Sequence, residues 1–319
     1  MKFLITGGCG FIGSHLAERL LADNHEVSVI DDLSTGNLEN VSGIHGKKNF
    51  HLVVDTVMNE VMVSELVEES DFVFHLAAVV GVKRVMENPV DSVVINVEGT
   101  YNVLKSCARF KRKILIASTS EVYGKNERIP FGEDADIIIG STRKKRWSYA
   151  CAKAMDEFLA LAYHEEKGLP VIIVRLFNTV GPRQSDRYGM VIPRFISQAL
   201  SKSPLTVFGD GMQTRCFIHV ADVLEALISI IGQEKAFGDV FNIGSSEEIT
   251  IKDLASRIIR MTGSSSRIEF VDPGSLYKSG FEDMNRRVPD TSKIRDLIGF
   301  TTRYKTDDIL RECIEGMSK

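Results

Sequence analysis

Lys2-Phe3-Leu4-Ile5-Thr6-Gly7-Gly8-Cys9-Gly10-Phe11-Ile12-Gly13 is the stretch that decides the fold. The apolar run at its start predicts a short strand, and the glycines that follow predict a turn. Apolar residues then recur at helical spacing, which predicts a helix directly after the turn. They are Phe11, Ile12, Leu16 and Leu20. The chain therefore begins with a strand, a glycine turn and a helix.

Strand-like and helical segments continue to alternate after this start. The apolar strand-like runs are 27–31, 51–54, 72–76, 113–117 and 171–176, and the helical stretches are 57–68, 90–110 and 147–167. Strands that are apolar throughout and alternate with helices are typical of a parallel sheet covered on both faces. We therefore expect an α/β protein with a Rossmann-like, doubly wound parallel sheet.

The pattern changes after about residue 178, where loops lengthen and glycine and proline recur. Shorter helices are predicted at 191–201, 220–231, 251–261 and 306–317. We expect a sheet domain over residues 1–178 and a smaller α/β lobe over 179–319, interleaved with the last strands of the sheet.

Composition excludes several classes of protein. A net charge of −4 over 319 residues argues against a dedicated nucleic-acid binder. The basic string 143–146 is expected to be a solvated face, with attraction of an anionic substrate as the alternative. The scattered cysteines form no C-x-x-C pair, no apolar run reaches membrane-spanning length, and the histidines show no metal-ligand spacing. We expect a soluble, cytoplasmic protein without a metal and without nucleic-acid or membrane partners.

The glycine turn has the features of a dinucleotide site. Gly7 permits the tight turn, Gly10 lets the backbone approach a pyrophosphate, and Gly13 allows the helix to pack closely on the strand. Phosphates then bind at the helix N-terminus. Asp31 ends the second predicted strand, where a carboxylate accepts hydrogen bonds from the adenosine ribose and repels a 2′-phosphate. This pattern favours NAD over NADP.

Tyr149 and Lys153 lie four residues apart on a predicted helix and share one face of it. A nearby ammonium and an oxidised nicotinamide both lower the pKa of a phenol, so Tyr149 can accept a hydroxyl proton while a hydride leaves the same carbon. The segment 118–124 follows a predicted strand and offers hydroxyl groups and one carboxyl group near the tyrosine. Ligands of open α/β sheets bind at such strand ends.

Together these motifs resemble the extended short-chain dehydrogenase/reductase family of nucleotide-sugar epimerases, dehydratases and decarboxylases. The matching segments are 6–13, 75–78, 96–100, 118–124, 149–153, 175–178, 181–183 and 208–211. The resemblance implies that residues 1–178 bind NAD, that residues 179–319 bind a nucleotide sugar, and that the sugar is oxidised at C4 to a ketone.

The resemblance also implies roles for single residues. Thr119 would hold the C4 hydroxyl group, and Ser120 and Glu121 would join Tyr149 and Lys153 in catalysis. The cofactor contacts would be Gly7, Gly10, Phe11, Ile12, Gly13, Asp31, Asp32, Ser34, Thr35, Gly36, Asp55, Thr56, Leu76, Ala77, Ala78, Asn96, Ser118, Tyr149 and Lys153. The substrate contacts would be Val80, Asn178, Arg183, Val191, Thr206, Phe208, Arg215 and Arg287.

The fate of the ketone separates the alternatives. Resembling 4,6-dehydratases carry Asp-Glu after the threonine, whereas this chain has Ser120, which argues against dehydration. The segments 119–124, 146–149, 178–183 and 280–289 look like UDP-glucuronate decarboxylases, although 150–152 lacks the acidic insertion that many of them carry. UDP-glucuronate decarboxylation is the first hypothesis, and 4-epimerisation of UDP-glucose or UDP-glucuronate is the second. A non-catalytic NAD-binding scaffold is a third, against which the intact Tyr149 and Lys153 argue.

The family analogy further implies a homodimer. The long amphipathic helices predicted around 90–110 and 147–167 are suited to pair across a two-fold axis as a four-helix bundle.

Overall fold

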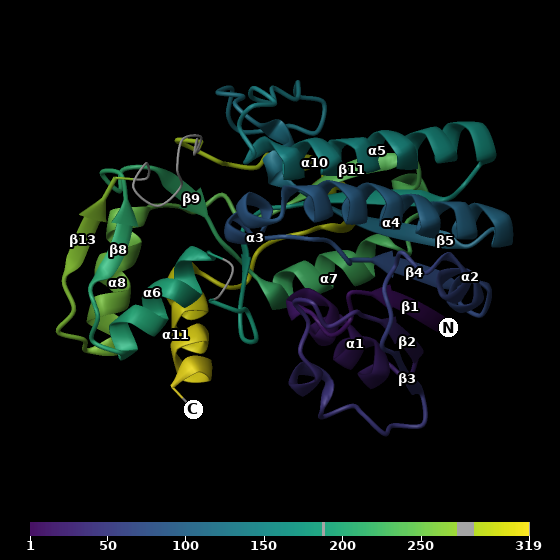
Figure 1. Cartoon of the computed structure of the whole chain (residues 1–319), viewed down its shortest axis with the longest axis horizontal. Coiled ribbons are helices and arrows are strands. Elements are labelled where there is room, and N and C mark those ends of the chain that lie inside the picture. The colour runs from purple at the N-terminus through teal and green to yellow at the C-terminus, as the bar shows by residue number, and fades with distance from the viewer. Residues whose placement is uncertain (187–188, 273–283, 319) are drawn as a thin grey trace.

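The computed structural model describes residues 1–186, 189–272 and 284–318. A parallel sheet with helices on both faces forms one side of the molecule, and a smaller lobe of short strands and helices forms the other (Figure 1). The predicted α/β architecture with a doubly wound parallel sheet is confirmed. No helix in these described ranges combines the length and apolar character that a membrane span requires.

The central sheet has the strand order β11-β6-β5-β4-β1-β2-β3, and every pairing in it is parallel. Its strands are β1 (Lys2–Thr6), β2 (Glu26–Ile30), β3 (Phe50–Val53), β4 (Phe72–His75), β5 (Lys113–Thr119), β6 (Val171–Leu176) and β11 (Asp239–Ile243). The order of the strands reverses direction between β1 and β4. Open α/β sheets bind ligands in the crevice that such a reversal leaves at the carboxyl ends of the strands.

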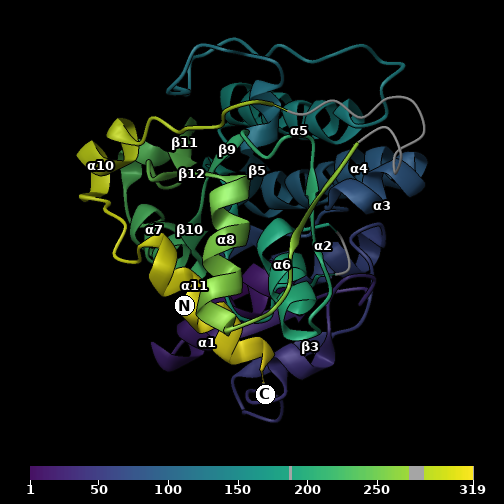
Figure 2. The same ribbon diagram turned by 90° about the vertical axis from the view of Figure 1, so that its left-hand side faces the viewer.

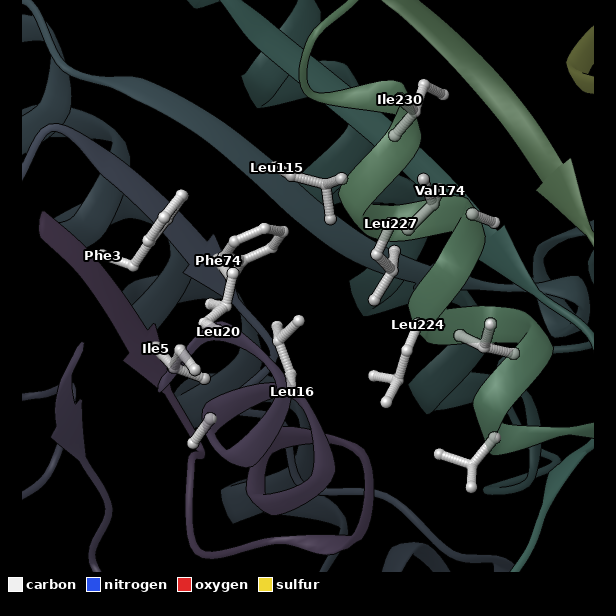
Figure 3. Packing of buried hydrophobic residues seen from close by; sticks show 14 of the residues in the cluster. Phe3, Ile5, Leu16, Leu20, Phe74, Leu115, Val174, Leu224, Leu227 and Ile230 are labelled. Atoms are coloured by element: carbon white, nitrogen blue, oxygen red, sulfur yellow. The ribbon is translucent and has the colours of Figure 1, made fainter. Parts of the chain in front are cut away.

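Helices bury both faces of this sheet. The helices α2 (Glu60–Glu68), α4 (Pro89–Phe110) and α5 (Trp147–Lys167) cover one face, and α1 (Phe11–Ala22), α7 (Val220–Ile230) and α10 (Ser292–Ile298) cover the other. Figure 3 shows the core of the second face, where leucines of α1 and α7 point toward apolar side chains of the strands. The labelled residues are Phe3, Ile5, Leu16, Leu20, Phe74, Leu115, Val174, Leu224, Leu227 and Ile230.

The smaller lobe has an apolar core of its own. Its helices α6 (Val191–Leu200), α8 (Ile251–Thr262) and α11 (Thr306–Met317) lie side by side in Figure 2. Its short strands pair as β8 (Leu205–Phe208) with β13 (Ile268–Val271), and as β9 (Thr214–Cys216) with β12 (Glu248–Thr250). Two further short strands, β7 (Thr179–Val180) and β10 (Ile218–His219), pair beside the sheet.

Several elements were not predicted individually. They are the strands from β7 onward, the helix α10, the helix α3 (Val82–Glu87) and the single 3₁₀ turns η1 (Leu38–Val41), η2 (Ser120–Tyr123) and η3 (Glu234–Ala236). The edge strand β11 comes from beyond residue 178, so the chain returns to the sheet after it has entered the lobe. A domain boundary near residue 178 stays a prediction.

The glycine turn is fixed by close backbone contacts. Gly7 has φ +74°, and a Cβ atom at this position would lie 2.9 Å from the backbone nitrogen of Ala77. A Cβ atom on Gly13 would lie 2.3 Å from the carbonyl oxygen of Gly7. Both contacts are with backbone atoms, which cannot rotate away, so only glycine fits.

Gly13→Ala should therefore lower the free energy of unfolding by about 1–3 kcal/mol, as overpacking does in a well-packed site. Gly132→Ala is the matched control, because a Cβ atom there meets nothing within 4 Å. The control should change stability by no more than about 0.5 kcal/mol. Urea denaturation of both variants measures the difference, and equal losses would contradict the account of the turn.

Candidate functional site

A cavity of about 340 Å³ opens at the carboxyl ends of β1, β4 and β5 and reaches the start of the smaller lobe. It lies at the reversal of strand order, where the topology predicts a ligand. Most of the predicted site residues line it: Gly7, Gly10, Phe11, Ile12, Gly13, Asp31, Asp32, Ser34, Thr35, Asp55, Leu76, Ala77, Ala78, Val80, Ser118, Thr119, Ser120, Glu121, Tyr149, Asn178 and Arg287.

Asp31 is held at the cavity by the glycine turn. Its carboxylate accepts the backbone N–H of Cys9 at 2.9 Å and that of Leu33 at 2.8 Å. Burial raises the pKa of Asp31, and these backbone hydrogen bonds oppose the rise. Gly36 does not line the cavity, but a Cβ atom there would lie 2.6 Å from Oδ1 of Asp31. The loop therefore leaves the carboxylate room beside the cavity, as a ribose-binding carboxylate needs.

Asn96 does not line the cavity itself, but it binds the backbone of Val79, which does. Its Oδ1 accepts the N–H of Val79 at 2.7 Å, and its Nδ2 donates to the carbonyl of Val79 at 3.3 Å. Thr56 is placed similarly, because its Oγ1 accepts the N–H of Met58 at 3.2 Å beside Asp55. Both predicted cofactor residues shape the loops around the cavity.

Tyr149 faces the end of β5. Its phenol shares a hydrogen bond with Thr119, and Oγ1 of Thr119 also accepts the N–H of Glu121 at 3.2 Å. Burial raises the pKa of Tyr149 above its ordinary value, the negative charges of Glu121 and Asp156 raise it further, and the hydrogen bond with Thr119 lowers it. The net effect of the surrounding protein favours the protonated phenol. Lys153, four residues further along α5, is only 1% exposed and does not line the cavity.

Glu121 is held between two arginines at the cavity wall. Its Oε2 lies 3.1 Å from Nη1 of Arg146, and its Oε1 lies 3.6 Å from Nη1 of Arg287. The arginine side chains are almost completely buried, whereas the glutamate side chain is 16% exposed. Arg146 belongs to the string expected to be a solvated face, and for this residue the structure corrects the expectation, because its side chain is buried at the cavity wall. The alternative, attraction of an anionic substrate, rested on the place of the string just before Tyr149.

A buried polar network supports the end of β5. Arg175 of β6 donates to Glu157 of α5 from Nη2 at 2.7 Å and from Nε at 3.1 Å, and Ser118 also donates to Glu157. Arg175 further donates to the hydroxyl of Tyr123 at 3.0 Å, and this hydroxyl donates to Asn242 of β11 at 2.8 Å. The network joins the strand that carries Thr119 to the helix that carries Tyr149.

Several predicted substrate residues lie away from the cavity lining. Arg183 binds Glu18 of α1 at 2.8 Å, and Arg215 donates to the carbonyl of Thr214 at 2.7 Å. Val191 begins α6, and Thr206 and Phe208 lie on β8. Their roles stay predictions, and residues 280–283 of the decarboxylase-like segment lie outside the described residues. Prediction missed Gln184 and Met190, which line the cavity from the side of the lobe.

Comparison with known proteins adds three observations. A family model described as GDP-mannose 4,6 dehydratase matches residues 4–313. The UDP-N-acetyl-alpha-D-glucosaminuronate decarboxylase of Bacillus cytotoxicus is 44% identical over 98% of this chain and 97% of its own, and UDP-glucuronic acid decarboxylase 1 of Danio rerio is 36% identical over 100% and 73%. The structure of UDP-glucuronic acid 4-epimerase from Bacillus cereus, in complex with UDP-glucuronic acid and NAD, superposes with a TM-score of 0.90 at 30% identity over 100% of this chain and 99% of that one.

The buried pair of Glu157 and Arg175 predicts a large effect on stability. Glu157→Gln keeps the shape of the side chain but leaves the guanidinium without its counter-charge, which typically costs about 3–5 kcal/mol. Asp307→Asn is the control, because it breaks a largely exposed pair with Arg257 whose atoms lie 3.0 Å apart. This control should lose at most about 1 kcal/mol. Chemical denaturation measures both, and a small loss in Glu157→Gln would refute the supporting role.

Proposed function

The chain belongs to the GDP-mannose 4,6-dehydratase family of nucleotide-sugar enzymes, and we propose that it oxidises a UDP-linked uronic acid at C4 and then decarboxylates it. The relatives from Bacillus cytotoxicus and Danio rerio, both named as decarboxylases of such sugars, support this proposal along nearly the whole chain. The observation in this structure that carries it is the pair of buried arginines around Glu121.

NAD is the cofactor, and the cavity fits it. Gly10, Phe11, Ile12 and Gly13, at the start of α1, line the cavity, so the N-terminus of this helix faces the place where a pyrophosphate would bind. Asp31 suits the adenosine ribose and disfavours a 2′-phosphate. When bound, NAD accepts a hydride from C4 and later returns one, so a complete cycle consumes no cofactor. Residues 1–178 would hold the cofactor and residues 179–319 the nucleotide sugar.

Tyr149 and Thr119 act in the oxidation. The phenolic oxygen of Tyr149 takes the proton of the C4 hydroxyl group, and the hydroxyl of Thr119, already within hydrogen-bond reach of the phenol, orients the sugar oxygen. The resulting ketone makes the C6 carboxylate part of a β-keto acid. The C5–C6 bond then breaks, its electron pair moves toward the C4 oxygen, and carbon dioxide leaves. A proton at C5 gives the 4-keto pentose. Return of the hydride to C4, and of the proton held on Tyr149 to the C4 oxygen, completes the UDP-linked pentose.

The two arginines allow the carboxylate of a substrate to bind beside the carboxylate of Glu121. A glutamate alone would repel the substrate carboxylate, but Arg146 and Arg287 supply two positive charges against its one negative charge. A guanidinium binds a carboxylate bidentately. In this proposal the arginines bind the uronate. The carboxylate of Glu121, whose side chain is the most exposed of the three, takes up a proton from solvent and passes it to C5.

The deciding experiment is incubation of the NAD-loaded protein with UDP-glucuronate and with UDP-N-acetylglucosaminuronate, followed by mass spectrometry and NMR. Release of carbon dioxide and formation of a UDP-linked pentose, or its 2-acetamido counterpart, is the expected outcome. UDP-glucose, which has no carboxylate, is the control and should lose no mass. Conversion of a substrate to its C4 epimer without loss of mass would replace the decarboxylase with the 4-epimerase, and no conversion of any sugar would favour the scaffold.

Two variants separate the steps of the same assay. Tyr149→Phe should slow oxidation by about 10²–10⁴-fold, because it lacks the proton acceptor. Glu121→Gln should form the 4-keto sugar but release carbon dioxide or complete the product slowly, so that the keto intermediate accumulates. Loss of oxidation in both variants to the same extent would assign Glu121 to the first step instead.

We also infer that the protein is a homodimer. The neighbouring helices α4 and α5 expose large apolar side chains, with Val90 at 71%, Tyr101 at 43%, Met155 at 47% and Phe158 at 66% (Figure 1). An apolar surface shared by two adjacent helices suits a four-helix contact with a second copy of the chain.

Phe158→Asp should therefore convert a dimer to a monomer, since it places a charge in the proposed contact. Phe270→Asp is the matched control, because Phe270 is 50% exposed on β13, in the smaller lobe. Light scattering at micromolar concentration gives the mass. A monomeric mass for the unaltered protein would exclude the dimer.

A further inference from the structure

The ammonium of Lys153 is bound by a buried carboxylate that does not line the cavity. Nζ of Lys153 lies 2.6 Å from Oδ2 of Asp156, one turn further along α5, and the two side chains are 2% and 0% exposed. The catalytic lysine is therefore not a lone positive charge beside Tyr149. Its charge is offset within hydrogen-bond distance.

Asp156 is in turn the end of a buried chain of hydrogen bonds. The hydroxyl of Thr100 on α4 is directed at Asp156 and lowers the pKa of this carboxyl group, against the rise that burial causes, because an ionised carboxylate accepts from a hydroxyl group. Oγ1 of Thr100 then accepts from Nε2 of His75 at 3.0 Å. Burial lowers the pKa of His75 to about 3, so the ring is neutral and its Nδ1 accepts the hydroxyl proton of Thr6 at 2.8 Å. Oγ1 of Thr6 accepts the N–H of Ala77 at 3.1 Å.

This order of donors assigns a direction to the whole chain. The hydrogen atoms point from the N–H of Ala77, after β4, through Thr6, His75 and Thr100 toward the carboxylate. Asp156 is the only charged group in this chain of hydrogen bonds. The carboxylate is thus bound by Lys153 on its own helix, and the hydroxyl of Thr100 on the neighbouring helix favours its ionised form. Its negative charge acts on Tyr149.

The other charged groups near the phenol are paired with opposite charges. Glu121, at η2, raises the pKa of Tyr149 as Asp156 does, and it lies 3.1 Å from Nη1 of Arg146 and 3.6 Å from Nη1 of Arg287. Glu157 on α5 is paired with Arg175 of β6, so this pair contributes little net charge. His75 on β4 is neutral, and α4 contributes the hydroxyl of Thr100.

We propose that Asp156 is a positioning residue of the C4 oxidation, which holds Lys153 in place and offsets its charge. Removal of the charge of Asp156 should then let Tyr149 release its proton at a lower pH. This inference rests on the proposed function, in which Tyr149 is the proton acceptor. It differs from a purely structural role, because the charge of Asp156 and not its volume is what matters.

Titration of the Tyr149 phenolate in the NAD-loaded protein tests the proposal without a sugar substrate. The signal is the ultraviolet phenolate absorbance, taken as the difference from the same protein with Tyr149→Phe. Asp156→Asn keeps the shape of the side chain and removes its charge, so the midpoint should move to lower pH by about one unit or more. Asp156→Glu should restore most of the original midpoint. An unchanged midpoint in Asp156→Asn would overturn the proposal.

A matched control separates charge from packing. Asp222 is another buried aspartate, 1% exposed on α7, which accepts the N–H of Arg303 at 3.1 Å. Asp222→Asn should lower stability and leave the Tyr149 midpoint in place, and an equal shift in this variant would also overturn the proposal. If Asp156→Asn does not fold, Thr100→Val removes the hydroxyl that favours the ionised form of Asp156 and should move the midpoint in the same direction by less.

Turnover provides the link to the proposed function. With a uronate substrate, the acid limb of the pH profile should move to lower pH in Asp156→Asn together with the phenolate midpoint. A shifted phenolate without turnover of any UDP-uronate would leave the role of Asp156 intact and refute the proposed substrate. Turnover of a UDP-uronate with an unshifted phenolate midpoint would support the proposed substrate and refute the role of Asp156.

Discussion

The pairing of Glu157 with Arg175 is the interaction on which the rest of the site depends. It joins α5 to β6, and through the hydrogen bond from Ser118 it also fixes the end of β5. Tyr149 lies on α5 and Thr119 at the end of β5, the two elements that Glu157 links through Ser118. A buried ion pair is weak evidence for stability in itself, because desolvation offsets much of its attraction. Here the pair links α5 to β6 and, through Ser118, to β5, so breaking it would leave a buried charge between the elements that carry Tyr149 and Thr119.

The sequence predicted the sheet well because its strands are short, wholly apolar and separated by long helices with clear periodicity. Every predicted strand before residue 178 is present within a few residues, and so are the long helices α4 and α5. The predictions were weakest where elements are held by pairing rather than by their own pattern. The two-residue strands β7 and β10 and the helix α3 contain too few residues to show a period, so only the folded chain reveals them.

The same difference between local patterns and long-range contacts explains which site residues could be predicted. Gly7, Asp31, Tyr149 and Glu121 could be identified because each belongs to a local motif, and all four line the cavity. Arg146 and Asp156 could not be assigned in the same way. Their importance lies in partners that the fold supplies, such as the shared contact with Glu121 or the hydroxyl of Thr100 on another helix. A charge in a sequence does not say whether it will face water or another charge, because this depends on distant residues.

The return of the chain to the sheet as β11 has a consequence for how the protein is made. Asn242 of β11 accepts from Tyr123 and donates to the carbonyls of Phe131 and Asp290, which adjoin the segment that carries Arg287. A nascent chain that has emerged only as far as β6 therefore contains Tyr149 and Lys153 but lacks the strand that completes the sheet's edge. These contacts join segments far apart in the sequence, so loop closure delays them relative to local ones. The glycine turn can form early during synthesis, whereas the arginine pair can assemble only when nearly the whole polypeptide is available.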